Sequence, residues 1–306
     1  MTGVVTSAAP LGHARSHFAG AVHDGLIYVF GGGGAGFKSL DSTEVYDPAG
    51  DTWSPCAPMP APRSGIAAAT LGDRILVMGG GFRNDDGTFD FKSTVDVYLP
   101  REDRWESGPS LVFRHDAPAS QALDGTVYLF GGHHPEAEGG PLTDPAFDVC
   151  EALVPGADAW ATISPMPTPR FSLALAPVDG TIWAMGGGAC QADGTFANLD
   201  TVESFDPKDG NWGPAPTCLP WPSAGPYATA YGDGLVVAGG NVDGKVTARM
   251  ARYRTQGNAW EELPPLPAPR VMGMLLDSGN GLFLIGGREA DAKTVTADVY
   301  RVQPGP

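Results

Sequence analysis

Histidines are scarce in this sequence, and several of them gather in one stretch. The chain has 306 residues and six histidines. His133 and His134 are adjacent and directly follow an apolar run that ends in a Gly-Gly pair. His115 stands eighteen residues before His133 and is followed by Asp116. The grouping predicts a site in which imidazoles and a carboxylate act together.

Three interpretations of this group stay open. An imidazole beside a carboxylate is held in one tautomer and titrates near neutrality, which suits proton transfer and polar ligand binding. Neutral imidazoles and a carboxylate can also bind a divalent metal, in which case the ligands would be His115, Asp116 and His133. The third possibility is a solvated loop rim. We take His115, Asp116, His133 and His134 as candidate catalytic residues, and no cofactor is expected unless a divalent metal binds.

The elements that carry these residues belong to an internal repeat. Six strand-like runs end in Gly-Gly, at intervals of 47 to 55 residues, and in four repeats an arginine stands sixteen residues before the pair. A further strand follows each pair, with an acidic residue in five of the six repeats, and then, in the first five repeats, a tryptophan. The acids are Glu44, Asp96, Asp148, Glu203 and Asp298. We expect them to pair with the arginines, and the tryptophans to pack between neighbouring repeats.

These features resemble the kelch repeat, notably in the segment WSPCAPMPAPRSG at 53–65 and in the Gly-Gly to Trp spacing. The resemblance covers nearly the whole chain. It implies an all-β fold, a six-bladed kelch-type β-propeller, as a single domain over 1–306. The repeats are expected at roughly 8–56, 57–108, 109–163, 164–215, 216–263 and 264–306. The last repeat lacks its outer strand, so we expect residues 1–7 to complete that blade and close the ring.

The resemblance also implies that ligands bind where the position after the repeat arginine and the positions after Gly-Gly meet. Blade 3 departs from the pattern, because Arg114 precedes Gly-Gly by seventeen residues and His115 by sixteen. Either the strand holds a bulge or His115 replaces the arginine. Residues around the same opening that differ between repeats are candidates for substrate binding. They are His17, Ser64, Phe82, Arg83, Phe171, Tyr227, Asn241, Arg288 and Glu289.

Composition narrows the class of partner. The formal net charge of −16 argues against nucleic acid and anionic membranes as partners. Four cysteines without zinc-like spacing suggest free thiols in a reducing compartment. Neither a signal peptide nor an apolar run of about 18 residues is evident. These observations predict a cytoplasmic protein.

Two classes of function remain, because this fold carries both enzymes and protein-binding modules. The first is a non-redox enzyme, an isomerase, cyclase or lyase, that acts on a small molecule by His/Asp proton transfer. One version of this hypothesis has a substrate that bears a carboxylate. Arg288 or Arg83 would anchor that substrate. The alternative is a protein- or peptide-recognition module that uses the same face. A divalent-metal-dependent lyase is the second alternative.

Overall fold

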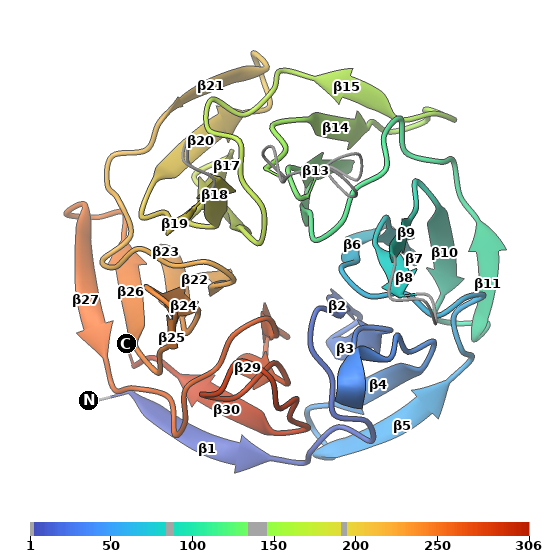
Figure 1. Ribbon diagram of the computed structural model, residues 1–306, viewed down its shortest axis with the longest axis horizontal. Helices are drawn as coiled ribbons and strands as arrows, with labels where there is room; N and C mark the ends of the chain where they lie inside the picture. The colour runs from blue at the N-terminus through green and yellow to red at the C-terminus, as the bar shows by residue number, and fades with distance from the viewer. Residues whose placement is uncertain (1–2, 84–88, 134–145, 191–194, 306) are drawn as a thin grey trace.

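The computed structural model describes residues 3–83, 89–133, 146–190 and 195–305 of the chain. Six four-stranded antiparallel sheets stand around a central channel like the blades of a propeller (Figure 1). Within each of the first five blades the chain runs from the strand beside the channel to the strand at the circumference. The all-β class and the six-bladed arrangement expected from the repeats are confirmed.

Each blade contributes one strand to each of four concentric layers. The strands that line the channel are β2 (Ala19–His23), β6 (Ala67–Leu71), β12 (Ala119–Leu123), β16 (Ala174–Val178), β22 (Tyr227–Tyr231) and β28 (Met274–Asp277). The second layer is β3 (Leu26–Phe30), β7 (Arg74–Met78), β13 (Thr126–Phe130), β17 (Thr181–Met185), β23 (Gly234–Ala238) and β29 (Leu282–Ile285). The third is β4 (Thr43–Asp47), β10 (Val95–Leu99), β14 (Cys150–Leu153), β20 (Val202–Asp206), β26 (Met250–Arg254) and β30 (Val299–Gln303). The outermost is β5 (Thr52–Cys56), β11 (Arg104–Ser107), β15 (Ala161–Ile163), β21 (Asn211–Pro214), β27 (Ala259–Leu263) and β1 (Val4–Ala8).

The ring is closed by the N-terminal strand. β1 pairs antiparallel with β30, and the register runs from Val4 opposite Gln303 to Ala8 opposite Val299. The last blade therefore takes its outer strand from the beginning of the chain, as the missing sixth tryptophan strand predicted. Because both chain ends contribute to one sheet, hydrogen bonds between them hold the ring shut.

Each second-layer strand is apolar because it is covered on both faces. All five residues of β13, TVYLF, are buried, and such a run is what a strand enclosed between two blades requires. The following Gly131 adopts φ +62°, and a Cβ there would lie 2.6 Å from the carbonyl oxygen of Arg170 in the next blade. The first glycine of the repeat thus permits both a left-handed turn and close contact between blades.

The tryptophans of the outer strands join each blade to its neighbour. Trp105 lies edge-on to Phe30 of the preceding blade, with ring centroids 5.5 Å apart, and its indole N–H donates to the carbonyl of Ala57 at 2.9 Å. Trp53 makes the same bond to Ala9. Their predicted packing between repeats is confirmed.

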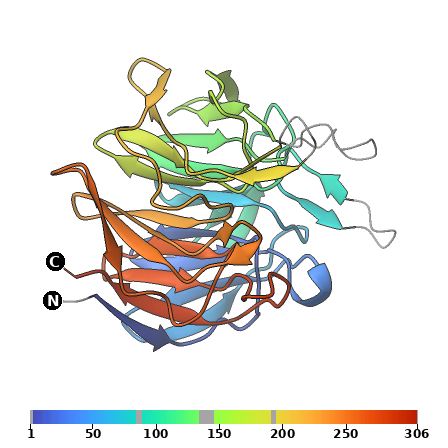
Figure 2. The same cartoon turned by 60° about the vertical axis from the view of Figure 1, so that its left-hand side comes forward.

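The loops beyond the glycine pairs carry small accessory elements. They are the 3-10 turn η1 (Ala35–Phe37) and three ribbons, β8 (Gly81–Arg83) with β9 (Phe89–Phe91), β18 (Gly188–Cys190) with β19 (Phe196–Asn198), and β24 (Asn241–Val242) with β25 (Lys245–Val246). Figure 2 shows η1 and the β8–β9 ribbon projecting on the same side of the ring. In the described part of the chain, no helix has the length and apolarity to cross a membrane.

Candidate functional site

The two sets of positions proposed for ligand binding meet in every blade. An isolated bridge joins the residue after the arginine position to the second residue after the first glycine. The six pairs are Ser16–Gly33, Ser64–Gly81, Asp116–His133, Phe171–Gly188, Ala224–Asn241 and Val271–Arg288. They form the rim of the central channel on the side of the accessory loops. This rim is called the mouth below.

His115 occupies the arginine position of blade 3, which decides between the two readings of that strand. Its Nδ1 lies 2.8 Å from the carbonyl oxygen of Gly131 and its Nε2 lies 3.0 Å from the carboxylate of Glu151. In blade 2 the guanidinium of Arg63 makes the matching contacts with Gly79 and Asp96. His115 is fully buried. Both ring nitrogens are engaged inside the blade, so the side chain does not reach the mouth.

The acid of blade 3 differs from the one expected from the sequence. Glu151, not Asp148, is the partner of the residue at the arginine position. Glu151 lies opposite Leu129 of β13, just as Glu44 lies opposite Val29 of β3. Cross-strand register therefore selects the acid in blades 1 to 4, and the loop before Glu151 alters its distance from Gly-Gly. In blade 6 the same position holds Tyr300, and Arg270 pairs with Asp298, two residues earlier. The other four expected pairs form, and they are Arg15–Glu44, Arg63–Asp96, Arg170–Glu203 and Arg270–Asp298.

Blade 5 has no ion pair at this place. Ser223 occupies the arginine position and donates from Oγ to the carbonyl of Gly239 at 3.3 Å. Ala251 stands where blades 1 to 4 have the acid. The buried indole of Trp221, with the guanidinium carbon of Arg249 4.4 Å from its centroid, occupies the neighbouring space. Apolar packing thus replaces a buried charge pair.

Tyr227 was selected as a substrate-binding candidate because other repeats have small residues there. The structure places it in the core between blades 5 and 6, where it is only 2% exposed. A Cβ on Gly273 of blade 6 would lie 2.8 Å from the tyrosine ring, so the missing side chain of Gly273 makes room for it. Burial raises the pKa of the phenol. Tyr227 therefore does not face the mouth.

His133 and Asp116 lie together at the mouth. His133 Nδ1 is 3.5 Å from Asp116 Oδ2, and the two side chains are 35% and 21% exposed. The imidazole packs against Phe171, with ring centroids 4.1 Å apart, and Phe171 in turn meets Phe196 edge-on. Among the described residues, His133 Nε2 has no hydrogen-bond partner although this atom is buried. The pair thus sets a carboxylate beside one imidazole nitrogen and leaves the other nitrogen without a partner among the described residues.

His17 belongs to a girdle of six residues, two positions after the arginine position in each blade. They are His17, Gly65, Ala117, Ser172, Gly225 and Met272, and all six have φ between +50° and +64°. Backbone hydrogen bonds join successive members, for example from His17 N–H to the Met272 carbonyl at 2.9 Å and from Gly65 N–H to the His17 carbonyl at 2.8 Å. The girdle surrounds a cavity of about 110 Å³.

His17 and Arg288 meet at Ser16. His17 Nδ1 lies 3.1 Å from Ser16 Oγ, and Arg288 Nε donates to the same oxygen at 3.2 Å. Burial lowers the pKa of His17 to about 3, and the positive charges of Arg288 and of protonated His133 act in the same direction. His17, His133 and Arg288 therefore share one electrostatic environment although they come from blades 1, 3 and 6.

The remaining candidates are placed as follows. Ser64 lies on the rim, and Phe82 is half-buried in β8. Asn241 Oδ1 accepts a hydrogen bond from Gly244 N–H at 2.8 Å within its own loop. Glu289 is half-buried and its N–H donates to the Thr294 carbonyl. His134 and the side chain of Arg83 lie outside the described residues.

The residues suggested for a metal do not form a ligand set. No group of three or more His, Cys, Asp or Glu side chains in the described ranges could hold a metal ion. Both nitrogens of His115 are already bonded within the blade. Asp116 and His133 remain, and two side chains are too few for a protein metal site.

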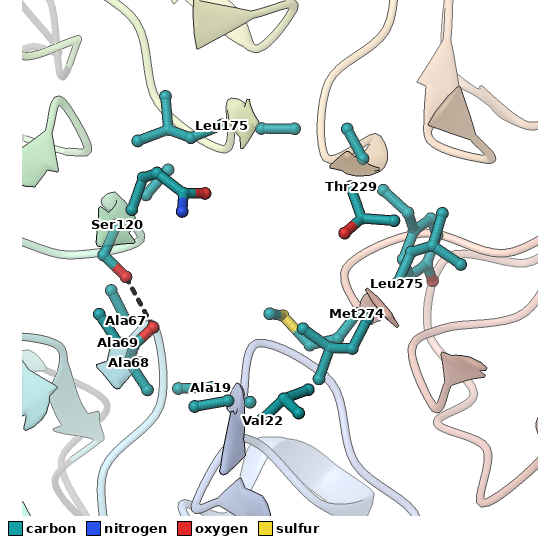
Figure 3. A pocket seen from close by; sticks show the side chains of 18 of the residues that line it. Ala19, Val22, Ala67, Ala68, Ala69, Ser120, Leu175, Thr229, Met274 and Leu275 are labelled. Atoms are coloured by element: carbon teal, nitrogen blue, oxygen red, sulfur yellow. Dashed lines mark hydrogen bonds between the residues drawn. The ribbon is translucent and has the colours of Figure 1, made fainter. Parts of the chain in front are cut away.

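A second, larger cavity lies along the axis, and the sequence reasoning did not anticipate it. This channel has a volume of about 600 Å³ and is lined by the six inner strands. Figure 3 shows Ala19, Ala67, Leu175, Thr229 and Met274 around it, with Ser120 Oγ donating to the Ala68 carbonyl at 2.9 Å. The sequence feature that could have indicated this channel is the run of small residues in several of the strands that follow the arginine positions. Among the described residues that line the channel, Asp277 is the one charged side chain and there is no histidine, so the mouth is the better candidate site for proton transfer.

Comparison with known proteins agrees with this architecture. The kelch motif model matches residues 14–60 and 62–112. Kelch-like protein 35 of Mus musculus is 27% identical over 92% of this chain and 44% of its own length. Kelch-like protein 34 of Homo sapiens is 32% identical over 69% and 31%, and Kelch-like protein terF of Aspergillus terreus is 28% identical over 79% and 53%. The chain thus spans about a third to a half of the length of these relatives.

A solved structure, "Structure of YjhT", superposes with a TM-score of 0.80 at 19% identity, over 96% of this chain and 99% of that one. At this identity the match concerns the fold. Together, the motif matches, the relatives and the six repeated blades show that the chain belongs to the kelch-repeat family.

Proposed function

We propose that the protein binds a small polar molecule at the mouth and transfers protons on it without redox chemistry, as an isomerase, cyclase or lyase. The observation that carries this proposal is the His133–Asp116 dyad, which lies at the mouth with Nε2 of the imidazole unpartnered. A histidine that keeps one nitrogen free and has a carboxylate beside the other is equipped to exchange a proton with a ligand.

The two residues have separate roles. His133 is the base or acid, through Nε2, and Asp116 orients the ring from the Nδ1 side. Their separation of 3.5 Å is longer than a hydrogen bond; such contacts in unliganded enzymes often tighten when the substrate binds. Phe171 packs against the imidazole and limits its movement. His115 has no part in this proposal because it is buried and paired.

The test begins with thermal unfolding of the purified protein against sugars, organic acids and amino acids, with and without a chelator. A ligand at a hundred times its Kd adds about 2.7 kcal/mol of stability. Compounds that stabilise the protein are then incubated with it and followed by NMR for isomerisation, cyclisation or elimination. His133→Gln and Asp116→Asn should abolish turnover, whereas His13→Gln, at a 59% exposed histidine bonded to Glu44, should preserve it. Full turnover in His133→Gln would refute the assignment.

Recognition of a protein or peptide is the second candidate, and exposed aromatic side chains favour it. Phe37 in η1 and Phe196 in β19 are 46% and 51% exposed, and Arg288 lies over the Phe37 ring at 4.6 Å. Aromatic residues and arginine are enriched at the centres of protein interfaces. This function predicts a stoichiometric partner that the Phe37→Ala, Phe196→Ala double variant no longer binds and that His133→Gln still binds.

A further inference from the structure

We propose that Arg288, Ser16 and His17 form an anion subsite where blades 6 and 1 meet, and that an anion bound there draws a proton onto His17. This inference rests on the proposed function, since it specifies the charge of the ligand and a pH dependence of its binding.

Ser16 is the centre of the subsite. It is fully buried, accepts a hydrogen bond from Arg288 Nε at 3.2 Å and lies 3.1 Å from His17 Nδ1. A hydroxyl can accept one bond while donating another, so Ser16 can donate to Nδ1 of a neutral imidazole. That tautomer places the ring proton on Nε2. The girdle bonds of the His17 backbone to Met272 and Gly65 hold the ring in position.

Arg288 supplies the positive charge. Within the described ranges, no carboxylate lies within 4 Å of its guanidinium, which is half-buried against Phe37. Nε and Nη1 donate to Ser16 and to the Ala292 carbonyl at 3.2 and 3.3 Å. Nη2 therefore keeps its two N–H groups for a ligand. A partly desolvated arginine without a counter-charge is the group that proteins use to bind carboxylates, sulfates and phosphates.

The charged groups that face His17 explain why a bound anion would favour protonation of its imidazole. Burial is the main cause of the low pKa of His17, and Arg288 from blade 6 and His133 from blade 3 add to it because both oppose a positive charge on the imidazole. Asp116 is the carboxylate beside His133 and is paired with it. A bound anion offsets the field of Arg288 and so favours imidazolium at His17. By linkage, an anion that raises the pKa by one unit binds the protonated form tenfold more tightly.

The experiment is a pH titration of the histidine side chains of the full chain by NMR, in sodium sulfate and in sodium chloride of equal ionic strength. We expect saturating sulfate to raise the titration midpoint of His17 by at least one pH unit. His17→Asn tolerates the left-handed backbone and should still bind sulfate, with a Kd that no longer depends on pH.

Two arginine variants complete the design. Arg288→Gln should raise the midpoint of His17 in chloride, because a cation is removed, and should abolish the effect of sulfate. Arg104→Gln, at a 48% exposed arginine on outer strand β11, removes the same charge and should change neither. An unchanged His17 midpoint in wild-type protein with sulfate bound, or no sulfate binding at all, overturns this inference. Both results leave the proposed function intact. The proposed function itself fails only if the turnover of no small molecule depends on His133.

Discussion

The buried arginine–carboxylate pairs predict a large loss of stability when one partner is removed. Blade 5, which lacks such a pair, shows which substitutions should restore that stability. In blade 4, Arg170 is fully buried and its guanidinium donates to the carbonyls of Gly186 and Thr201 and to the carboxylate of Glu203. Glu203→Ala leaves this cation without its counter-charge. Breaking a buried pair in this way costs about 3–5 kcal/mol. At roughly 2 °C per kcal/mol for a chain of this size, Tm should fall by about 6–10 °C.

Blade 5 provides the matched rescue. The positions of Arg170, Glu203 and Thr168 are occupied there by Ser223, Ala251 and Trp221. The triple variant Thr168→Trp, Arg170→Ser, Glu203→Ala copies that arrangement into blade 4. It leaves no charge buried and the indole fills the vacated volume, so we expect it to recover at least half of the lost stability.

Urea unfolding and differential scanning calorimetry of the wild type, the single variant and the triple variant measure both effects. A cost for Glu203→Ala below about 1 kcal/mol, the range of an exposed ion pair, would refute the reasoning. So would a triple variant no more stable than the single one.

Three other predictions follow from the same contacts. The pKa of His17 is about 3 in the folded protein and about 6.5 in the unfolded chain, so only the unfolded chain takes up this proton as the pH falls from 7 to 5. In urea unfolding, the wild type should therefore lose up to about 2 kcal/mol more unfolding free energy than His17→Asn over this range. Equal losses in the two proteins would contradict the burial of the ring. Tyr227→Ala should cost about 3–5 kcal/mol by calorimetry, yet leave ligand Kd unchanged, whereas weaker binding without a loss of stability would place Tyr227 at the mouth after all. Deletion of residues 2–8 removes β1 and its pairing with β30, and should lower Tm and speed amide exchange first in β30, while unchanged exchange there would show that the ring does not depend on this closure.

The sequence predicted the ring because its periodic features have local causes. Gly-Gly recurs in all six blades, the arginine sixteen residues earlier in four and the outer tryptophan in five, because each meets a packing requirement of the ring. The same counting placed His115 at the arginine position, although Arg114 left a bulge possible. His133 and Arg288 each follow a Gly-Gly pair, and this position in the repeat correctly predicted that they lie at the mouth.

The predictions that were wrong concerned residues whose place depends on pairing across strands or on packing between blades. The acid of blade 3 was misidentified because a longer loop separates Glu151 from Gly-Gly, and only its register opposite Leu129 identifies it. Tyr227 seemed exposed because the space that it fills is created by Gly273 in the next blade. The girdle was hidden because His17 and Met272 adopt a left-handed backbone without being glycine.

The most direct test of the account follows the histidine signals of the full chain by NMR while a stabilising small molecule is added. The proposed site predicts that the signals of His17 and His133 move together, with one saturation curve, and that His23, buried at the far end of β2, stays unchanged. A small molecule that stabilises the protein but leaves His17 and His133 unmoved would show that its binding site lies elsewhere, and the assignment of the mouth would be wrong.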